Sequence, residues 1–220
     1  MTAGRRRQKH KPDWSTEELA IVDALDTPEK IQGFLDEVAY NDVEEYRSPR
    51  LVMRDRRAHC FEGALFASAV LEHHGWGCRI LDMHAVRDDD HIIALFQQHG
   101  CWGAVAKSNF TTLQFREPVY RTLRELVMSF FDVYFNTAGD KSLRSYSRSV
   151  DLRRFDHLGW RTTEEDLDPT IGEHLVAARH TPILTRAMER SLRRVGRRLF
   201  DAAMLGANPK GLFDAGGYDH

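Results

Sequence analysis

The spacing of apolar residues predicts two short helices near the start of the chain, within residues 15–41. The break between them falls at Asp26-Thr27-Pro28. Asp26 or Thr27 can cap the second helix, and Pro28 suits its first turn, where the N–H that proline lacks has no helical partner to lose.

A third helix is predicted to begin at Cys60 or just before it. The residues of its core-facing side recur at steps of three and four: Phe61, Ala64, Leu65, Ala67, Ser68 and Leu71. Gly75 follows them and suits the left-handed position that commonly ends a helix. The predicted helix therefore carries Cys60 at its N-terminus.

Three short runs rich in β-forming residues follow, at residues 78–86, 91–97 and 101–107. Residues 98–100 form a link short enough for a hairpin. We therefore expect three antiparallel strands in a small sheet. A helix packed on that sheet, with further helices at both ends of the chain, is an α+β fold.

Helical spacing returns in the second half of the chain. Residues 117–136 carry a broad apolar stripe after Pro118, which predicts another core helix. Residues 139–169 have no clear period and are interpreted as loop with short elements. Residues 170–204 are predicted to be helical, with one apolar stripe in their last part: Leu184, Met188, Leu192, Val195 and Leu199.

Length and composition indicate one domain. The chain has 220 residues, of which 42% are hydrophobic and 29% charged, enough for a full core. We expect a basic flexible tail at residues 1–14, a domain at 15–204 and a flexible tail at 205–220. Within the domain, the core spans about residues 50–136 and a helical extension about residues 140–204.

The expected localisation is cytoplasmic. No apolar run approaches the ~18 residues that a membrane span needs, and the basic N-terminus lacks the apolar stretch of a secretory signal. The three cysteines, Cys60, Cys78 and Cys101, are an odd number without paired spacing, which argues against a disulfide framework.

Overall charge does not favour nucleic-acid binding, because 31 Lys and Arg face 33 Asp and Glu, a net charge of −2. Residues 179–200 nevertheless hold seven Arg and one Glu. These arginines lie away from the apolar stripe and are interpreted as the solvated face of a helix. The alternative is an acidic partner, or nucleic acid, docking on helix 186–198.

Histidines and cysteines crowd residues 59–101, and both side chains bind zinc. Structural zinc sites favour closely spaced Cys or His pairs, and none of the cysteines pairs in this way. We therefore expect no metal and no cofactor. Cys78 and Cys101 are interpreted as core residues of strands.

Cys60 is a candidate nucleophile. Unpaired N–H groups and the positive end of the helix dipole favour a thiolate at a helix N-terminus, and Arg56 and Arg57 add positive charge. The same N–H groups can receive an oxyanion from an attacked carbonyl. Alone, a helical cysteine is more often a small buried hydrophobe.

A thiol nucleophile needs a base and a group that orients the base. His91 opens the second strand and is the candidate base. Asn109, or else Ser108, stands at the end of the third strand and is the candidate orienting residue. The alternatives are structural roles for His91 and Asn109, and His59 as the base.

The order of these residues resembles the transglutaminase-like branch of the papain-type thiol enzymes. A helix-borne Cys60 is followed by Gly75 and Arg79 in a Gly-x-x-x-Arg turn, by His91 on the next strand, and by Trp102 on the one after. The family's third-strand Asp is absent, and Ser108-Asn109 stands near its place, as in a Cys-His-Asn site. The helical remainder is similar to bacterial members without assigned substrates.

The resemblance implies a papain/transglutaminase-like core and thiol-dependent acyl chemistry: hydrolysis of, or transfer from, an amide, ester or thioester. The substrate would be a peptide, a protein or a small acyl compound. Because the usual Asp is missing, the alternative is a non-catalytic binding module with a degraded triad.

Overall fold

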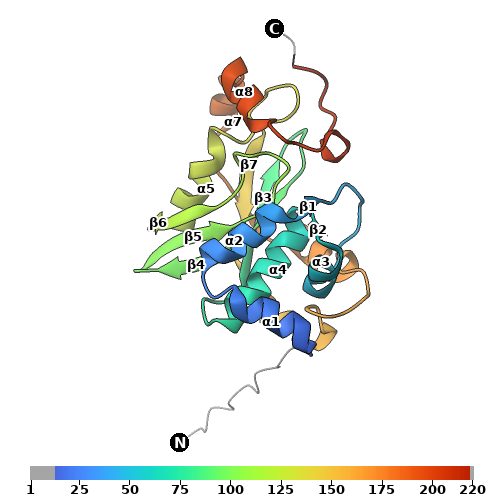
Figure 1. Cartoon of the computed structure of the whole chain (residues 1–220). Coiled ribbons are helices and arrows are strands. Elements are labelled where there is room, and N and C mark those ends of the chain that lie inside the picture. The colour runs from blue at the N-terminus through green and yellow to red at the C-terminus, as the bar shows by residue number, and fades with distance from the viewer. Residues whose placement is uncertain (1–12, 219–220) are drawn as a thin grey trace, which may run out of the picture.

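The structure is a computed structural model that describes residues 13–218. It has an α+β architecture, in which helix α4 (Cys60–His73) packs on a seven-stranded antiparallel sheet (Figure 1). Of the predicted N-terminal tail, all but Asp13 and Trp14 lies outside the described residues. No helix within residues 13–218 is long and apolar enough to cross a membrane.

The three predicted strands are confirmed, but the sheet is larger than expected. Its strands are β3 (Arg79–Ala85), β4 (His91–Gln98), β5 (Cys101–Val105), β6 (Arg116–Tyr120), β7 (Leu143–Ser147), β8 (Val150–Asp151) and β9 (His180–Pro182). They run in the order β6-β5-β4-β3-β7-β9, and β8 also pairs with β3. A separate parallel pair joins β1 (Ala39–Tyr40) to β2 (Arg57–Ala58).

The predicted N-terminal helices are also present. Thr27, rather than Asp26, caps the second helix by accepting a hydrogen bond from the Lys30 N–H, and Gly75 has the predicted positive φ, 82°. The α-helices besides α4 are α1 (Thr16–Ala24), α2 (Pro28–Glu37), α3 (Pro49–Asp55), α5 (Leu123–Phe131), α6 (Glu173–Val176), α7 (Arg186–Arg190) and α8 (Arg197–Ala203). Three shorter turns of helix are η1 (Leu152–Leu158), η2 (Asp168–Gly172) and η3 (Pro209–Gly211).

The prediction of one helix over residues 117–136 is wrong in its first part. Residues 116–120 form strand β6, and helix α5 begins only at Leu123. Strand β6 lies at an edge of the sheet. Pro118 is tolerated there, because an N–H that faces away from the neighbouring strand would have no strand partner, so its absence in proline removes no hydrogen bond. The apolar stripe is real in α5, which buries Leu126, Val127 and Phe130.

The prediction of a long helix over residues 170–204 is also wrong. The segment is divided among η2, α6, β9, α7 and α8. Pairing with β7 draws residues 180–182 into the sheet, and Pro182 would in any case interrupt a helix. The arginines of residues 186–198 therefore do not form one continuous helical face.

Side chains of the central strands alternate between two cores. Ile80, Ile92, Ala94 and Phe96 lie on the α4 face of the sheet, in the clusters that contain residues of α4. Leu81, Met83, Ile93 and Leu95 lie on the opposite face, in the cluster that contains residues of α5. Because successive strand residues point to opposite faces, this alternation decides which candidate residues meet.

Candidate functional site

Cys60 is the first residue of α4, as predicted, and its neighbours fix the start of that helix. The Nδ1 atom of His59 accepts a hydrogen bond from the Phe61 N–H at 3.3 Å, and the Glu62 carboxylate accepts one from the His59 N–H at 2.9 Å. His59 Nε2 donates to the Glu45 carbonyl at 2.7 Å. One ring nitrogen thus caps the helix and the other binds the Glu45 carbonyl, which is not the placement of a base for Cys60.

Glu62 anchors this helix start in a buried polar network. Its side chain is fully buried and accepts hydrogen bonds from Asn41 Nδ2, at 3.0 Å, and from Arg47 Nε. Arg47 also pairs with Asp55 at 3.0 Å. Sequence reasoning missed this network, although Glu three residues after a capping position is a known helix-start pattern.

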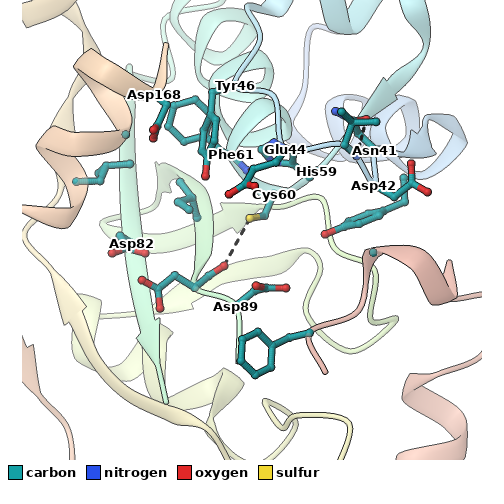
Figure 2. Close-up of a pocket in the computed structure, with 18 of the residues that line it drawn as sticks. Asn41, Asp42, Glu44, Tyr46, His59, Cys60, Phe61, Asp82, Asp89 and Asp168 are labelled. Atoms are coloured by element: carbon teal, nitrogen blue, oxygen red, sulfur yellow. Dashed lines mark hydrogen bonds between the residues drawn. The ribbon is translucent and has the colours of Figure 1, made fainter. Parts of the chain in front are cut away.

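Cys60 lies in the wall of a cavity of about 400 Å³ (Figure 2). Six acidic residues line this cavity: Asp42, Glu44, Asp82, Asp89, Asp90 and Asp168. Among the described residues that line it, Lys210 is the one Lys or Arg. The cavity next to the candidate nucleophile is therefore strongly acidic, a property that the sequence analysis did not anticipate.

The Cys60 thiol is only partly exposed, and its Sγ donates a hydrogen bond to the Asp90 carbonyl at 3.6 Å. Burial, with a smaller contribution from the negative charge of Asp89, raises the pKa of this thiol to about 12, although the Ile92 N–H acts to lower it. In this conformation the group is a neutral thiol at pH 7. The helix N-terminus alone does not offset the loss of solvation.

His91 lies on the α5 face of the sheet. Its ring packs edge-on against Phe130 and Tyr134, and Nε2 donates to the Leu113 carbonyl at 2.9 Å. Burial lowers the pKa of His91 to about 4, so the imidazole is neutral at pH 7. Cys60 and His91 both line a second, smaller cavity at the end of the sheet, but no hydrogen bond within residues 13–218 joins them.

Asn109 and Ser108 line the same small cavity, but each side chain has a different partner from the predicted one. The Asn109 amide donates to the carbonyls of Asn208 and Gly211 and accepts from the Asn208 N–H. Ser108 Oγ accepts from the Phe110 N–H. Within the described chain the Leu113 carbonyl holds His91, and neither polar side chain makes the expected contact.

Asp82 and His180 form a pair that sequence reasoning missed. Asp82 lies on the α4 face of β3, and its Oδ2 accepts a hydrogen bond from His180 Nε2 at 2.9 Å. Burial and the nearby charge of Asp90 together raise the pKa of Asp82 to about 6, although the hydrogen bond from His180 acts to lower it. The two residues are 98 positions apart, and only the pairing of β9 with β7 brings them together.

The other cysteines do not belong to this site. Cys78 is buried just before β3, and Cys101 is partly exposed at the start of β5. Across residues 13–218, no group of three or more His, Cys, Asp and Glu side chains is arranged to hold a metal ion.

No protein-family model matches the chain, and no curated protein matches it. The resemblance to transglutaminase-like enzymes therefore stays a prediction carried by the residues quoted above.

Proposed function

We propose that the chain performs thiol-dependent acyl chemistry at Cys60, on a papain/transglutaminase-like fold. The main observation that supports this proposal is that Cys60 is the first residue of a 14-residue helix and faces a cavity large enough for a substrate side chain. The following strands come in the order expected for such a fold, with His91 on the second of them.

In the proposed reaction, the Cys60 sulfur forms a bond to the carbonyl carbon of an amide, ester or thioester, and the bond from that carbon to the leaving nitrogen, oxygen or sulfur breaks. His91 Nδ1 takes the thiol proton and returns it to the leaving group, because the Leu113 carbonyl keeps the other proton on Nε2. Water then releases an acid, or an amine takes the acyl group. This step requires the thiol to leave the Asp90 carbonyl and come within reach of Nδ1.

A second candidate function is a non-catalytic binding module. It is favoured by the neutral state of the Cys60 and His91 side chains. Cys60 donates its hydrogen bond to the Asp90 carbonyl and His91 to the Leu113 carbonyl, so the two side chains do not bind each other. In that case the cavity serves only to bind a ligand.

Alkylation of Cys60 by iodoacetamide as a function of pH separates the two functions. The measurement uses a Cys78→Ala/Cys101→Ser background, with Cys60→Ser as the blank and His91→Gln as the test variant. The matched control is His157→Gln, an exposed histidine of η1 that lines neither cavity.

The acyl chemistry predicts labelling faster than that of a free thiol near neutral pH, slowed in His91→Gln and unchanged in His157→Gln. Labelling no faster than that of a free thiol, and indifferent to His91, leaves the binding module as the function. Circular dichroism of each variant confirms that it folds.

A further inference from the structure

We infer that the acidic cavity beside Cys60 binds an organic cation, the guanidinium or ammonium group at the end of an arginine-like or lysine-like side chain, with Asp82 as its buried anchor. This inference goes beyond the proposed function, because a binding module would hold the same group. Under the acyl chemistry, the cation is the part of the substrate that the cavity recognises.

The charge of the lining is the first support. Four of its carboxylates have no hydrogen bond or ion pair within the described residues: Asp42, Glu44, Asp89 and Asp168. Unpaired carboxylates in one concave site repel one another and lower the free energy of a bound cation. Lys210, which carries the only Lys or Arg charge of the lining in the described part of the chain, is exposed.

The second support is an unpaired oxygen of Asp82. This residue is only 3% exposed, and its Oδ1 atom is buried without a hydrogen-bond partner among residues 13–218, whereas Oδ2 is held by His180. Leaving a buried carboxylate oxygen unpaired costs free energy, and a donor from a ligand would remove that cost. Figure 2 shows Asp82 across the cavity from Cys60, with Asp89 and Asp168 on neighbouring walls.

The remaining lining favours an organic cation with an alkyl stem over a metal ion. Within residues 13–218, no three His, Cys, Asp or Glu side chains are placed to ligate one ion. The cavity instead combines its carboxylates with aromatic and aliphatic side chains: Tyr46, Phe61, Ile92, Leu175 and Val176. Such surfaces bury the methylene groups of a long basic side chain while the charged end meets oxygen acceptors.

The probe for this site is Nα-acetyl-arginine amide, and its control is Nα-acetyl-citrulline amide, which has the same shape but no charge. Binding to the full chain is measured by NMR titration, which detects weak ligands. The test variant is Asp82→Asn. Asp89→Asn, a cavity carboxylate with no hydrogen bond to lose, is the second variant, in case Asp82→Asn impairs folding. The matched control is Asp201→Asn, because Asp201 pairs with Arg197 outside the cavity.

We expect the arginine probe to bind and the citrulline probe to bind at least tenfold more weakly. Asp82→Asn should weaken binding of the arginine probe by about tenfold or more, Asp89→Asn by a smaller factor, and Asp201→Asn not at all. Equal binding of the two probes, no binding of either, or wild-type affinity in both cavity variants overturns the inference. None of these outcomes depends on thiol reactivity, so the proposed function can fail while this site stands.

Discussion

Asn109 and Asn208 bind each other through two hydrogen bonds: Asn109 Nδ2 donates to the Asn208 carbonyl at 2.8 Å, and the Asn208 N–H donates to Asn109 Oδ1 at 2.7 Å. A third bond joins Asn109 Nδ2 to the Gly211 carbonyl at 2.9 Å. Residues 208–213, predicted from sequence as part of a flexible tail, are thereby held beside the site, where Gly211 and Phe213 line both cavities.

Replacing Asn109 with Ala should therefore loosen the C-terminal segment. The loss of three partly buried hydrogen bonds is expected to lower the free energy of unfolding by roughly 1–3 kcal/mol and to speed amide exchange at residues 208–213. Urea unfolding and hydrogen exchange measure the two effects. Ser108→Ala, which removes one local bond to the Phe110 N–H, is the control and should change both less.

The same variant tests the role predicted for Asn109 from sequence. If the Leu113 carbonyl orients His91, Asn109→Ala leaves the His91-dependence of Cys60 labelling intact. Loss of that dependence would restore Asn109 as the orienting residue.

The depressed pKa of His91 predicts an acid-dependent loss of stability. Burial lowers its pKa to about 4 from an ordinary value of 6.5, so the unfolded chain binds this proton first as the pH falls. The contribution of the neutral His91 to the free energy of unfolding is fully present above pH 6.5. It decreases by on the order of 3 kcal/mol as the pH drops to about 4.

The measurement is the difference in free energy of unfolding between wild type and His91→Gln, from pH 7 to pH 4. Asp82 and Asp88 have raised pKa values and therefore increase the free energy of unfolding as the pH falls, opposite to His91. Because both residues are present in the wild type and in the variant, their effects largely cancel in the difference. The free energy of unfolding of His91→Gln should therefore rise relative to that of the wild type as the pH falls. A constant difference would mean that His91 is not buried as a neutral imidazole.

Local signals predicted the elements that carry the site. The helix start at Cys60, Gly75 after the helix, and the three strands up to residue 107 all follow from short-range patterns, and the structure confirms them. The predictions of helices at residues 117–136 and 170–204 were wrong where pairing with a neighbouring strand determines the local structure. Pairing of Trp102 with Tyr120, and of Ser147 with His180, draws helix-like segments into strands.

Contacts between side chains were less accessible from sequence. Strand alternation puts His91 on the α5 face, and this depends on the register of β4, which sequence order does not specify. The partners of Asn109 and Asp82 lie 99 and 98 residues away, in segments without a distinctive motif. Residue order thus led only to a proposed chemistry, whereas the acidic lining of the cavity became visible only in the fold.

The buried charge of Glu62 is predicted to hold the start of α4 in place. Glu62→Gln leaves Arg47 without a full countercharge in a buried site and should lower the free energy of unfolding by roughly 3 kcal/mol. Glu164→Gln, whose exposed carboxylate lies 3.3 Å from Arg54, should cost below about 1 kcal/mol. Chemical denaturation compares the two variants, and similar losses in both would contradict the structural role of Glu62.

Binding of a cation in the cavity should weaken in acid, with a midpoint set partly by Asp82. Burial raises the pKa of Asp82 to about 6; below that pH the carboxyl is neutral and attracts the ligand less. The groups that face it act in known directions: Asp90 raises its pKa, whereas His180 and His84 lower it. Affinity for Nα-acetyl-arginine amide should therefore fall as the pH drops from 7.5 to 5, and the bound cation should shift the midpoint below 6.

Asp82→Asn should remove the part of this pH dependence that lies near pH 6, leaving a shallower decline from the other cavity carboxylates. The titration is repeated with Lys210→Gln, which removes a competing positive charge from the rim and should strengthen binding by about twofold at every pH. An affinity that does not change with pH in the wild type, or that falls equally steeply in Asp82→Asn, would show that the ligand does not reach the buried Asp82 carboxylate.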